Sequence, residues 1–236
     1  AVFTGSGIIR VLPPGTIFKS ASFDTAGTTS WICPEGVTSI QVECWGGGGA
    51  GGSASTTGAA QVYVAGGGGA GGAYARKSII PVTPGNAYPV TIAPAAVALS
   101  PSTASTGDRV NGADISFTGD NSITVLAKGG QGGQCVINPA QTQGGIGGAG
   151  TTTGSISDGT GFVYAGGDGY FPPTKGGSGG GGAGNSEDGG DGYLEDIDDA
   201  DSASLPGAGG EQGGGEGGTG AANVGNGGNG FSPGGG

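Results

Sequence analysis

Apolar and polar residues alternate over short stretches in the N-terminal half of the chain. Ile40, Val42 and Cys44 alternate with polar neighbours, which is the two-residue period of a strand with one buried face. The stretch 28–33 is rich in β-branched and aromatic residues, and 34–36 has the composition of a turn. The pattern therefore predicts that these two strands form a β-hairpin.

Further strands are predicted between residues 84 and 125. A turn at 84–86 precedes one alternating strand, whose apolar positions are Tyr88, Val90 and Ile92. A second hairpin is predicted from strands around 115–117 and 123–125 that flank a turn at 119–121. Because no stretch combines helical spacing with capping residues, we expect an all-β N-terminal part and essentially no α-helix.

Glycine recurs along the chain with a period of three residues. The repeat matches the polyproline II helix, which has three residues per turn and no internal hydrogen bonds, so its backbone groups must bond to neighbouring chains. Where two of three positions lack a Cβ, helices can approach closely. We therefore predict packed polyglycine II rods, with the third residue of each triplet at the solvent or the rim. The runs are 48–53, 68–73, 129–134, 144–149, 176–184, 214–219 and 225–230.

Composition also supports a disordered alternative for these runs. Glycine makes up 63 of the 236 residues, and residues 138–236 have few large apolar side chains, as in flexible linkers and disordered chains. The number of runs, and their start within the strand-patterned half, favour packed rods. The sequence thus predicts an N-terminal segment (1–21), a β-rich part (22–137) and rods with exposed loops (138–236).

Charge and composition argue against several classes of function. The 18 acidic residues outnumber the 7 basic ones and give a net charge of −11, which disfavours binding to nucleic acid. Without histidine, the Ser-His and Cys-His catalytic pairs and the commonest zinc sites cannot form. No apolar stretch is long enough for a transmembrane helix. We expect a protein without enzymatic activity, cofactor, metal site or membrane insertion.

The three cysteines, Cys33, Cys44 and Cys135, allow at most one disulfide within the chain. Cys33 and Cys44 lie at opposite ends of the first predicted hairpin, whereas a direct bridge needs Cα atoms within about 7 Å. We therefore expect these two cysteines to be buried as small apolar residues.

Residues 31–49, W-I-C-P-E-G-V-T-S-I-Q-V-E-C-W-G-G-G-G, resemble the opening of the glycine-rich domain of phage tail and adhesin proteins. That family has an aromatic strand, P-x-G-V-T, an alternating strand and W-G-x-G-G-G-G. The similarity continues through 68–92 and 116–133 and covers about residues 22–150. It implies a β-structured base that carries packed polyglycine II helices. In related long-tailed phages, distal adhesins of this kind bind host receptors through loops.

The resemblance leads us to expect a structural virion protein, a tail-fibre or tail-tip adhesin that is extracellular when assembled. Its expected partners are other virion or fibre subunits, further copies of itself, and a host-surface receptor made of protein or glycan. The alternative is a self-assembling extracellular or virion filament subunit with a purely structural role. A third possibility is a cell-surface matrix protein with disordered glycine tracts.

Two near-identical hexapeptides, 166–171 and 189–194, are the candidate contact sites. In each, a glycine triplet ends and presents an aromatic–apolar pair, Tyr170-Phe171 and Tyr193-Leu194. Exposed aromatic side chains on loops suit the recognition of a receptor. The same pairs also suit a structural role as plugs that cover the ends of the rods.

Two segments depart from the family pattern, 1–21 and the acidic insert 185–201. Within the insert, 195–201 has the carboxylates to bind calcium, but a solvated acidic loop is favoured because charge runs are usually exposed. The N-terminal segment is predicted to contact a neighbouring subunit through its apolar residues, which are Ile8, Ile9, Val11, Ile17 and Phe18.

Overall fold

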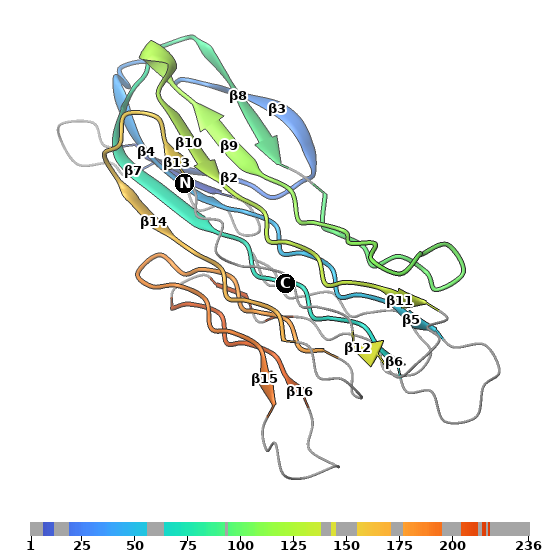
Figure 1. The fold of residues 1–236 in the computed structure, drawn as a ribbon. Helices are drawn as coiled ribbons and strands as arrows, with labels where there is room; N and C mark the ends of the chain where they lie inside the picture. The colour runs from blue at the N-terminus through green and yellow to red at the C-terminus, as the bar shows by residue number, and fades with distance from the viewer. Residues whose placement is uncertain are drawn as a thin grey trace.

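The computed structural model describes residues 7–11, 19–55, 64–92, 94–137, 143–144, 155–170, 177–194, 204–211, 214–215 and 217. A β-sandwich lies at one end, and long extended segments run from it to the opposite end (Figure 1). The only helix in these residues is a short 3-10 turn, η1 (Asp120–Ser122), which confirms the predicted all-β class. None of the described segments is a helix of the length and apolarity that crosses a membrane.

The first sheet of the sandwich has five strands, and all of its neighbouring pairs are antiparallel. In spatial order they are β14 (Phe162–Tyr164), β7 (Tyr74–Pro81), β4 (Ser39–Trp45), β1 (Gly7–Val11) and β2 (Lys19–Phe23). β1 therefore lies inside the sheet, between β4 and β2.

The second sheet is also five-stranded and antiparallel. In spatial order it contains β13 (Ser155–Ile156), β10 (Thr124–Ala127), β9 (Ile115–Thr118), β8 (Ala87–Ile92) and β3 (Gly27–Ile32). The chain crosses from β2 to β3 on one side of the sandwich and from β13 to β14 on the other.

The core of the sandwich consists of apolar side chains from both sheets. Alternate residues of β8 face it, so Tyr88 and Val90 are buried while Pro89 is exposed, as the two-residue period predicts. Three aromatic rings meet there, with centroids 5.9 Å apart for Trp31 and Tyr88 and 6.4 Å apart for Trp31 and Phe117. Cys33 and Cys44 are free and buried in the same core.

The first predicted hairpin is wrong, although both of its strands exist. β3 pairs with β8, and β4 pairs with β1 and β7 in the other sheet. The connection between β3 and β4 crosses the sandwich instead of closing a hairpin, and it buries Cys33 and Val37 on the way. Each strand thus turns its apolar face toward the opposite sheet. A turn sequence such as 34–36 serves either connection, so composition alone does not distinguish them.

The second predicted hairpin is confirmed by the antiparallel pairing of β9 with β10. The turn between them contains η1, where Asn121 has φ 57°. Gly36 has φ 78°, the left-handed conformation expected of glycine in the turn at 34–36.

Several strands continue directly into the extended segments that form the rest of the molecule, which we call the stack (Figure 1). β4 leads into 46–53, 66–73 leads into β7, and β10 leads into 128–135. The stack segments are 46–53, 66–73, 108–114, 128–135, 165–170, 177–184, 188–192 and 206–211.

Backbone hydrogen bonds between stack segments repeat every third residue. In one antiparallel pair, the N–H groups of Gly46, Gly49 and Gly52 donate to the carbonyls of Ala73, Ala70 and Gly67, with N···O distances of 2.8–2.9 Å. In one parallel pair, those of Gly130, Gly133 and Val136 donate to Gly47, Ala50 and Ser53, with N···O distances of 2.9 Å. These described segments are therefore bonded laterally, whereas a flexible linker leaves such groups to water.

Close approach of backbones explains the glycines of the stack. A Cβ added at Gly71 would lie less than 3.0 Å from the backbone of Gly181 and Gly182, and one added at Gly49 equally close to that of Gln131. Side chains are thus excluded where two backbones touch.

The third residues of the triplets are placed differently from the prediction. Gln131 is exposed, but Ala50, Ser53, Ala70 and Ala73 are buried, none with more than 2% of its surface exposed. The prediction that these positions face solvent is wrong inside the stack, because inner segments have neighbours on every side and leave room only for a methyl or hydroxymethyl group.

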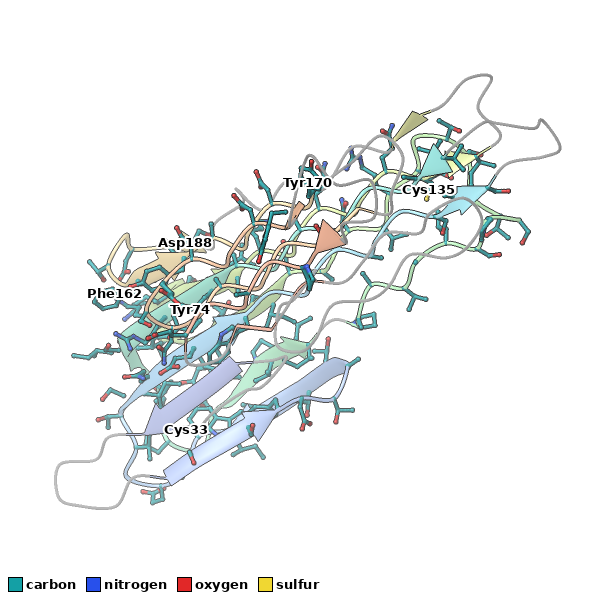
Figure 2. All side chains as sticks on the ribbon, turned by 90° about the horizontal axis from the view of Figure 1, so that it is seen from below. Cys33, Tyr74, Cys135, Phe162, Tyr170 and Asp188 are labelled. Atoms are coloured by element: carbon teal, nitrogen blue, oxygen red, sulfur yellow. The ribbon has the colours of Figure 1, made fainter. Side chains whose placement is uncertain are left out.

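Short strand pairs occur within the stack region. Two are parallel: β5 (Ala54–Ser55) with β11 (Val136–Ile137), and β6 (Val64–Ala65) with β12 (Gln143–Gly144). One is antiparallel: β15 (Tyr193–Leu194) with β16 (Ser204–Leu205). Cys135 precedes β11 and is free and buried; Figure 2 places it far from Cys33. The burial of Cys33 and Cys44 confirms the prediction made for those two residues.

Candidate functional site

The two predicted contact hexapeptides lie side by side in the stack. Segments 165–170 and 188–192 run parallel, since the N–H of Gly189 donates to the carbonyl of Ala165 and that of Gly192 to the carbonyl of Asp168, both with N···O distances of 2.9 Å. From the sequence, the two copies were predicted only as separate contact sites. The structure joins them into one surface.

The predicted contact residues differ in exposure. Tyr193 has 52% of its surface exposed. Tyr170 is half-buried (Figure 2), and its backbone lies within the stack, since its N–H donates to Ser178 and its carbonyl accepts from Gly68. Phe171 lies outside the described residues, and of Leu194 only the backbone pairing in β15 is described. Among the contact residues whose side chains the structure describes, Tyr193 is therefore the one with an exposed ring.

Acidic side chains complete the bonding between these two segments. The N–H of Ala165 donates to Oδ1 of Asp188 and the N–H of Asp168 donates to Oδ1 of Asp191, each with an N···O distance of 2.7 Å. The sequence analysis did not assign this role to the aspartates. A signal was present, because Asp188 and Asp191 are separated by two glycines and so repeat with the period of the stack.

The same arrangement occurs on segment 108–114. The N–H of Gly129 donates to Oδ1 of Asp114 and that of Gly132 to Oδ1 of Asn111, each with an N···O distance of 3.0 Å. Asp114 also accepts a 2.6 Å salt bridge from Lys128 through Oδ2. Asn111 and Asp114 are again three residues apart, so both pairs follow the triplet repeat.

A buried lysine fixes the segment that links the two sheets between β13 and β14. Lys77 Nζ forms a 2.8 Å salt bridge with Asp158 and donates hydrogen bonds to the carbonyl and hydroxyl oxygens of Thr160, at 3.1 Å and 2.5 Å. The Lys77 side chain is 9% exposed and that of Asp158 is 37% exposed. Hydrogen bonding to Lys77 is the main reason why the pKa of Asp158 lies below its ordinary value of 3.8.

Aromatic rings line the outer face of the first sheet where it meets the stack. The Tyr74 ring centroid lies 4.9 Å from that of Trp45 and 6.1 Å from that of Tyr164. Burial, and then the charge of nearby Glu43, raise the pKa of Tyr74. Tyr74 is fully buried and Glu43 nearly so, so this cluster joins the two parts of the molecule and is closed to large ligands.

Exposed apolar side chains are scattered over both parts. Arg76 lies over the exposed ring of Phe162, with Cζ 4.7 Å from the ring centroid, a cation–π contact at the edge of the first sheet. The exposed large apolar residues among those described are Ile32, Ile79, Val97, Phe162, Val163 and Tyr193.

The predicted assembly residues fall partly outside the described structure. Ile17 and Phe18 lie outside it. Ile8, Ile9 and Val11 belong to β1, whose backbone pairs with β2 and with β4. The N-terminal segment therefore contributes a strand to the sandwich, and its role in assembly stays a prediction, as does the three-part division of the chain.

The remaining chemical candidates concern metals and thiols. No group of three or more acidic or cysteine side chains suited to a metal occurs among the residues that the structure describes, and the predicted acidic loop 195–201 lies outside them. Burial is the main cause that raises the pKa of the Cys44 thiol to about 12, which leaves it without nucleophilic character near neutral pH.

Comparison with known proteins adds a family relationship. The family model described as a glycine-rich domain matches residues 24–236. No curated protein matches the chain.

Proposed function

The chain belongs to the glycine-rich domain family, and from this premise we propose that it is a non-enzymatic structural protein of a virion. In this proposal it is a tail-fibre or tail-tip adhesin, extracellular when assembled, that presents loops on a polyglycine II scaffold. It binds other virion subunits and a protein or glycan receptor on a host surface.

The three-residue hydrogen-bond repeat supports the polyglycine II conformation of the stack. Polyproline II geometry has three residues per turn and directs backbone groups outward, so bonds to one neighbour recur every third residue. Gly46, Gly49 and Gly52 follow this rule toward one neighbour, while Gly47 and Ala50 follow it toward segment 108–114. One segment thus bonds to different neighbours through different faces.

The continuity between strands and stack is the observation that carries the proposal. Because β4 runs without a linker into 46–53 and β10 into 128–135, these stack segments are held at a fixed place relative to the sandwich and can support loops there. Binding through such rigid supports avoids much of the entropy cost of ordering a surface. A stack built from backbone contacts also gives a thin, extended scaffold that needs few large side chains.

Tyr193 is the residue that the proposal places against a receptor. Its ring is 52% exposed, and tyrosine offers a large apolar face and a hydroxyl at low entropy cost. Asp191 and Asp188, two and five residues before it in the chain, are also exposed and carry carboxylate oxygens, a combination that suits hydroxyl-rich glycans as well as basic protein surfaces.

Binding to intact bacterial cells tests the adhesin proposal. Fluorescently labelled protein is incubated with a panel of bacterial strains, and bound fluorescence is measured by flow cytometry. We expect wild-type protein to bind some strains and Tyr193→Ser to lose most of that binding. Ile32→Ser, which removes another exposed side chain (66% exposed) on the sandwich, serves as the matched control and should bind normally. Equal binding by all three proteins would show that Tyr193 does not contribute to receptor binding. If no protein bound to any strain, the adhesin proposal would be contradicted.

One feature favours the filament alternative. β3 lies at the edge of the second sheet, all of its residues except Trp31 are exposed, and none of them is charged. Uncharged edge strands are templates for pairing with another chain. Negative-stain microscopy and sedimentation of wild-type protein and Thr29→Lys separate the cases. Polymers that the lysine abolishes would favour a filament, and discrete wild-type particles would contradict it.

A further inference from the structure

Inner segments of the stack satisfy their backbone through several neighbours. Segment 66–73 is the clearest case, since it exchanges backbone hydrogen bonds with four other segments. The bonded segments are 46–53, 128–135, 165–170 and 177–184. All residues of 66–73 are buried. The backbone groups of this segment that form these bonds therefore have partners because other backbones lie on several of its sides.

Segment 165–170 is bonded differently on the side that faces 188–192. The carbonyls of Ala165 and Asp168 accept from backbone N–H groups of 188–192, as in the interior. The N–H groups of the same two residues donate to the carboxylates of Asp188 and Asp191 instead. Segment 188–192 thus bonds both backbone groups of Ala165 and Asp168. Its backbone N–H groups donate to their carbonyls, and its aspartate side chains accept from their N–H groups.

The second occurrence is independent in sequence and position. Segment 108–114 accepts from Gly129 and Gly132 through the side chains of Asp114 and Asn111, and its own Gly112 donates to the carbonyl of Gly130. Again a single segment bonds its neighbour through backbone and side chains together. Both occurrences space the side chains three residues apart, which matches the repeat of the N–H groups they satisfy.

We propose that Asp and Asn side chains spaced three residues apart close the edges of the stack. Each side-chain oxygen takes the place of a carbonyl from one further segment, so the N–H groups at the edge no longer offer a pairing site to a second copy of the chain. A carboxylate acceptor forms a stronger bond than a neutral one.

The device is the stack's counterpart of the protected edge strand of a β-sheet. Sheets prevent edge-to-edge association with charges, prolines and bulges. In the stack, the same result comes from acceptors that repeat with the backbone. The inference goes beyond the proposed function, because it rests on these hydrogen bonds and holds whichever molecule the loops bind.

Amide exchange and sedimentation of two double variants test the proposal. Asp188→Ala/Asp191→Ala removes the acceptors, while Asp188→Asn/Asp191→Asn keeps an oxygen at each position. Both variants change the net charge from −11 to −9, since each loses two of the 18 acidic residues, so they differ in the acceptor alone. We expect the alanine variant to show at least about tenfold faster exchange at the amides of Ala165 and Asp168 and concentration-dependent association. The asparagine variant should stay close to wild type in both.

Two results would overturn the proposal. Unchanged exchange in the alanine variant would mean that the side chains do not protect these amides. Association of the asparagine variant to the same extent as the alanine variant would mean that charge, and not the acceptor, keeps copies apart.

A second pair of variants covers the case in which the alanine double variant does not fold, which tryptophan fluorescence reports. Asn111→Ala removes an acceptor without changing charge, and Asn111→Asp retains one. Faster exchange at Gly132 in the first variant and near-normal exchange in the second would support the proposal, and equal exchange in both would overturn it.

Discussion

The sandwich and the stack fill their interiors in opposite ways. In the sandwich, large side chains such as Trp31, Tyr88 and Phe117 occupy the space between two sheets. In the stack, the buried residues are chiefly glycine, alanine and serine, and the space that a Cβ of Gly180 would take is occupied by the backbone of Gly167 and Asp168. The first core depends on the hydrophobic effect, and the second on close-packed hydrogen-bonded backbones.

This difference determines which kind of change each part tolerates. Removing atoms from the sandwich leaves a cavity, while adding atoms to the stack forces backbones apart and breaks the bonds between them. Substitutions of similar size should therefore have different consequences in the two parts, and the following predictions are ordered by the size of the expected effect.

Gly180→Val should cost at least about 3 kcal/mol of unfolding free energy or prevent folding. A Cβ at this position would lie less than 3.0 Å from the backbone of two neighbouring residues, which cannot move aside as a flexible side chain can. Urea unfolding followed by circular dichroism gives the difference from wild type.

Gly190→Ala is the control for this prediction. Its added Cβ would meet its nearest atom, the backbone N of Ala208, at 3.3 Å, so a small displacement accommodates it, and a loss below about 1 kcal/mol is expected. Gly180→Ala adds the same single carbon as this control, and equal losses for Gly180→Ala and Gly190→Ala would contradict an exclusion that depends on backbone contact.

Val125→Ala removes atoms from the sandwich and should cost about 2 kcal/mol, because Val125 is fully buried between the sheets and a cavity remains. Ile79→Ala on the neighbouring sheet is the matched control, since Ile79 is 68% exposed and should change stability by less than about 0.5 kcal/mol. If Val125→Ala lowered the unfolding free energy as little as Ile79→Ala, the stability of the sandwich would also depend chiefly on backbone hydrogen bonds.

The Lys77–Asp158 bridge makes the stability of the sandwich depend on pH. Because hydrogen bonding to Lys77 lowers the folded-state pKa of Asp158 below 3.8, the bridge stabilises the protein above the unfolded-state pKa, and the stabilisation is lost as pH falls through the folded-state pKa. Wild type should therefore unfold at higher temperature than Asp158→Asn at pH 7, and the gap should shrink as the pH falls below 3.8.

Asp24→Asn, on the other side of the sandwich, removes the same charge from an exposed residue whose only described bond is to Thr25. At pH 7 it should unfold close to the wild-type temperature. A gap between wild type and Asp158→Asn that persists unchanged in acid would show that the stabilisation does not come from the ionised carboxylate.

Local patterns predicted five of the ten strands of the sandwich, which are β3, β4, β8, β9 and β10. The two-residue alternations in β4 and β8 and the turn between β9 and β10 are features of neighbouring residues, and they are correct. The pairing of β3 with β8 in place of β4 depends on how two apolar faces meet across the core, which no local pattern records. The same limit applies to the Lys77–Asp158 bridge, whose partners lie far apart in the chain.

The stack could be predicted from its repeat but not in its arrangement. The triplet period indicated lateral hydrogen bonding, and the described segments have it. Which segments lie inside depends on three-dimensional order, so the burial of Ala50 and Ala70 was not predicted. In retrospect, the third residue of the triplet carries this information: Ala or Ser occurs in inner segments, and Asp or Asn at the edges.

Because the hydrogen bonds of the stack repeat every three residues, a stack segment can change in length only by multiples of three residues. Inserting one or two residues into a stack segment would turn its glycines away from their neighbours, whereas inserting three restores every contact one step further along. Bonded neighbours such as 46–53 and 66–73 must lengthen together, by about 9 Å per triplet at the rise of a polyproline II helix. Longer and shorter relatives of this protein should therefore differ by matched triplets, with the reach of their loops changing in equal steps.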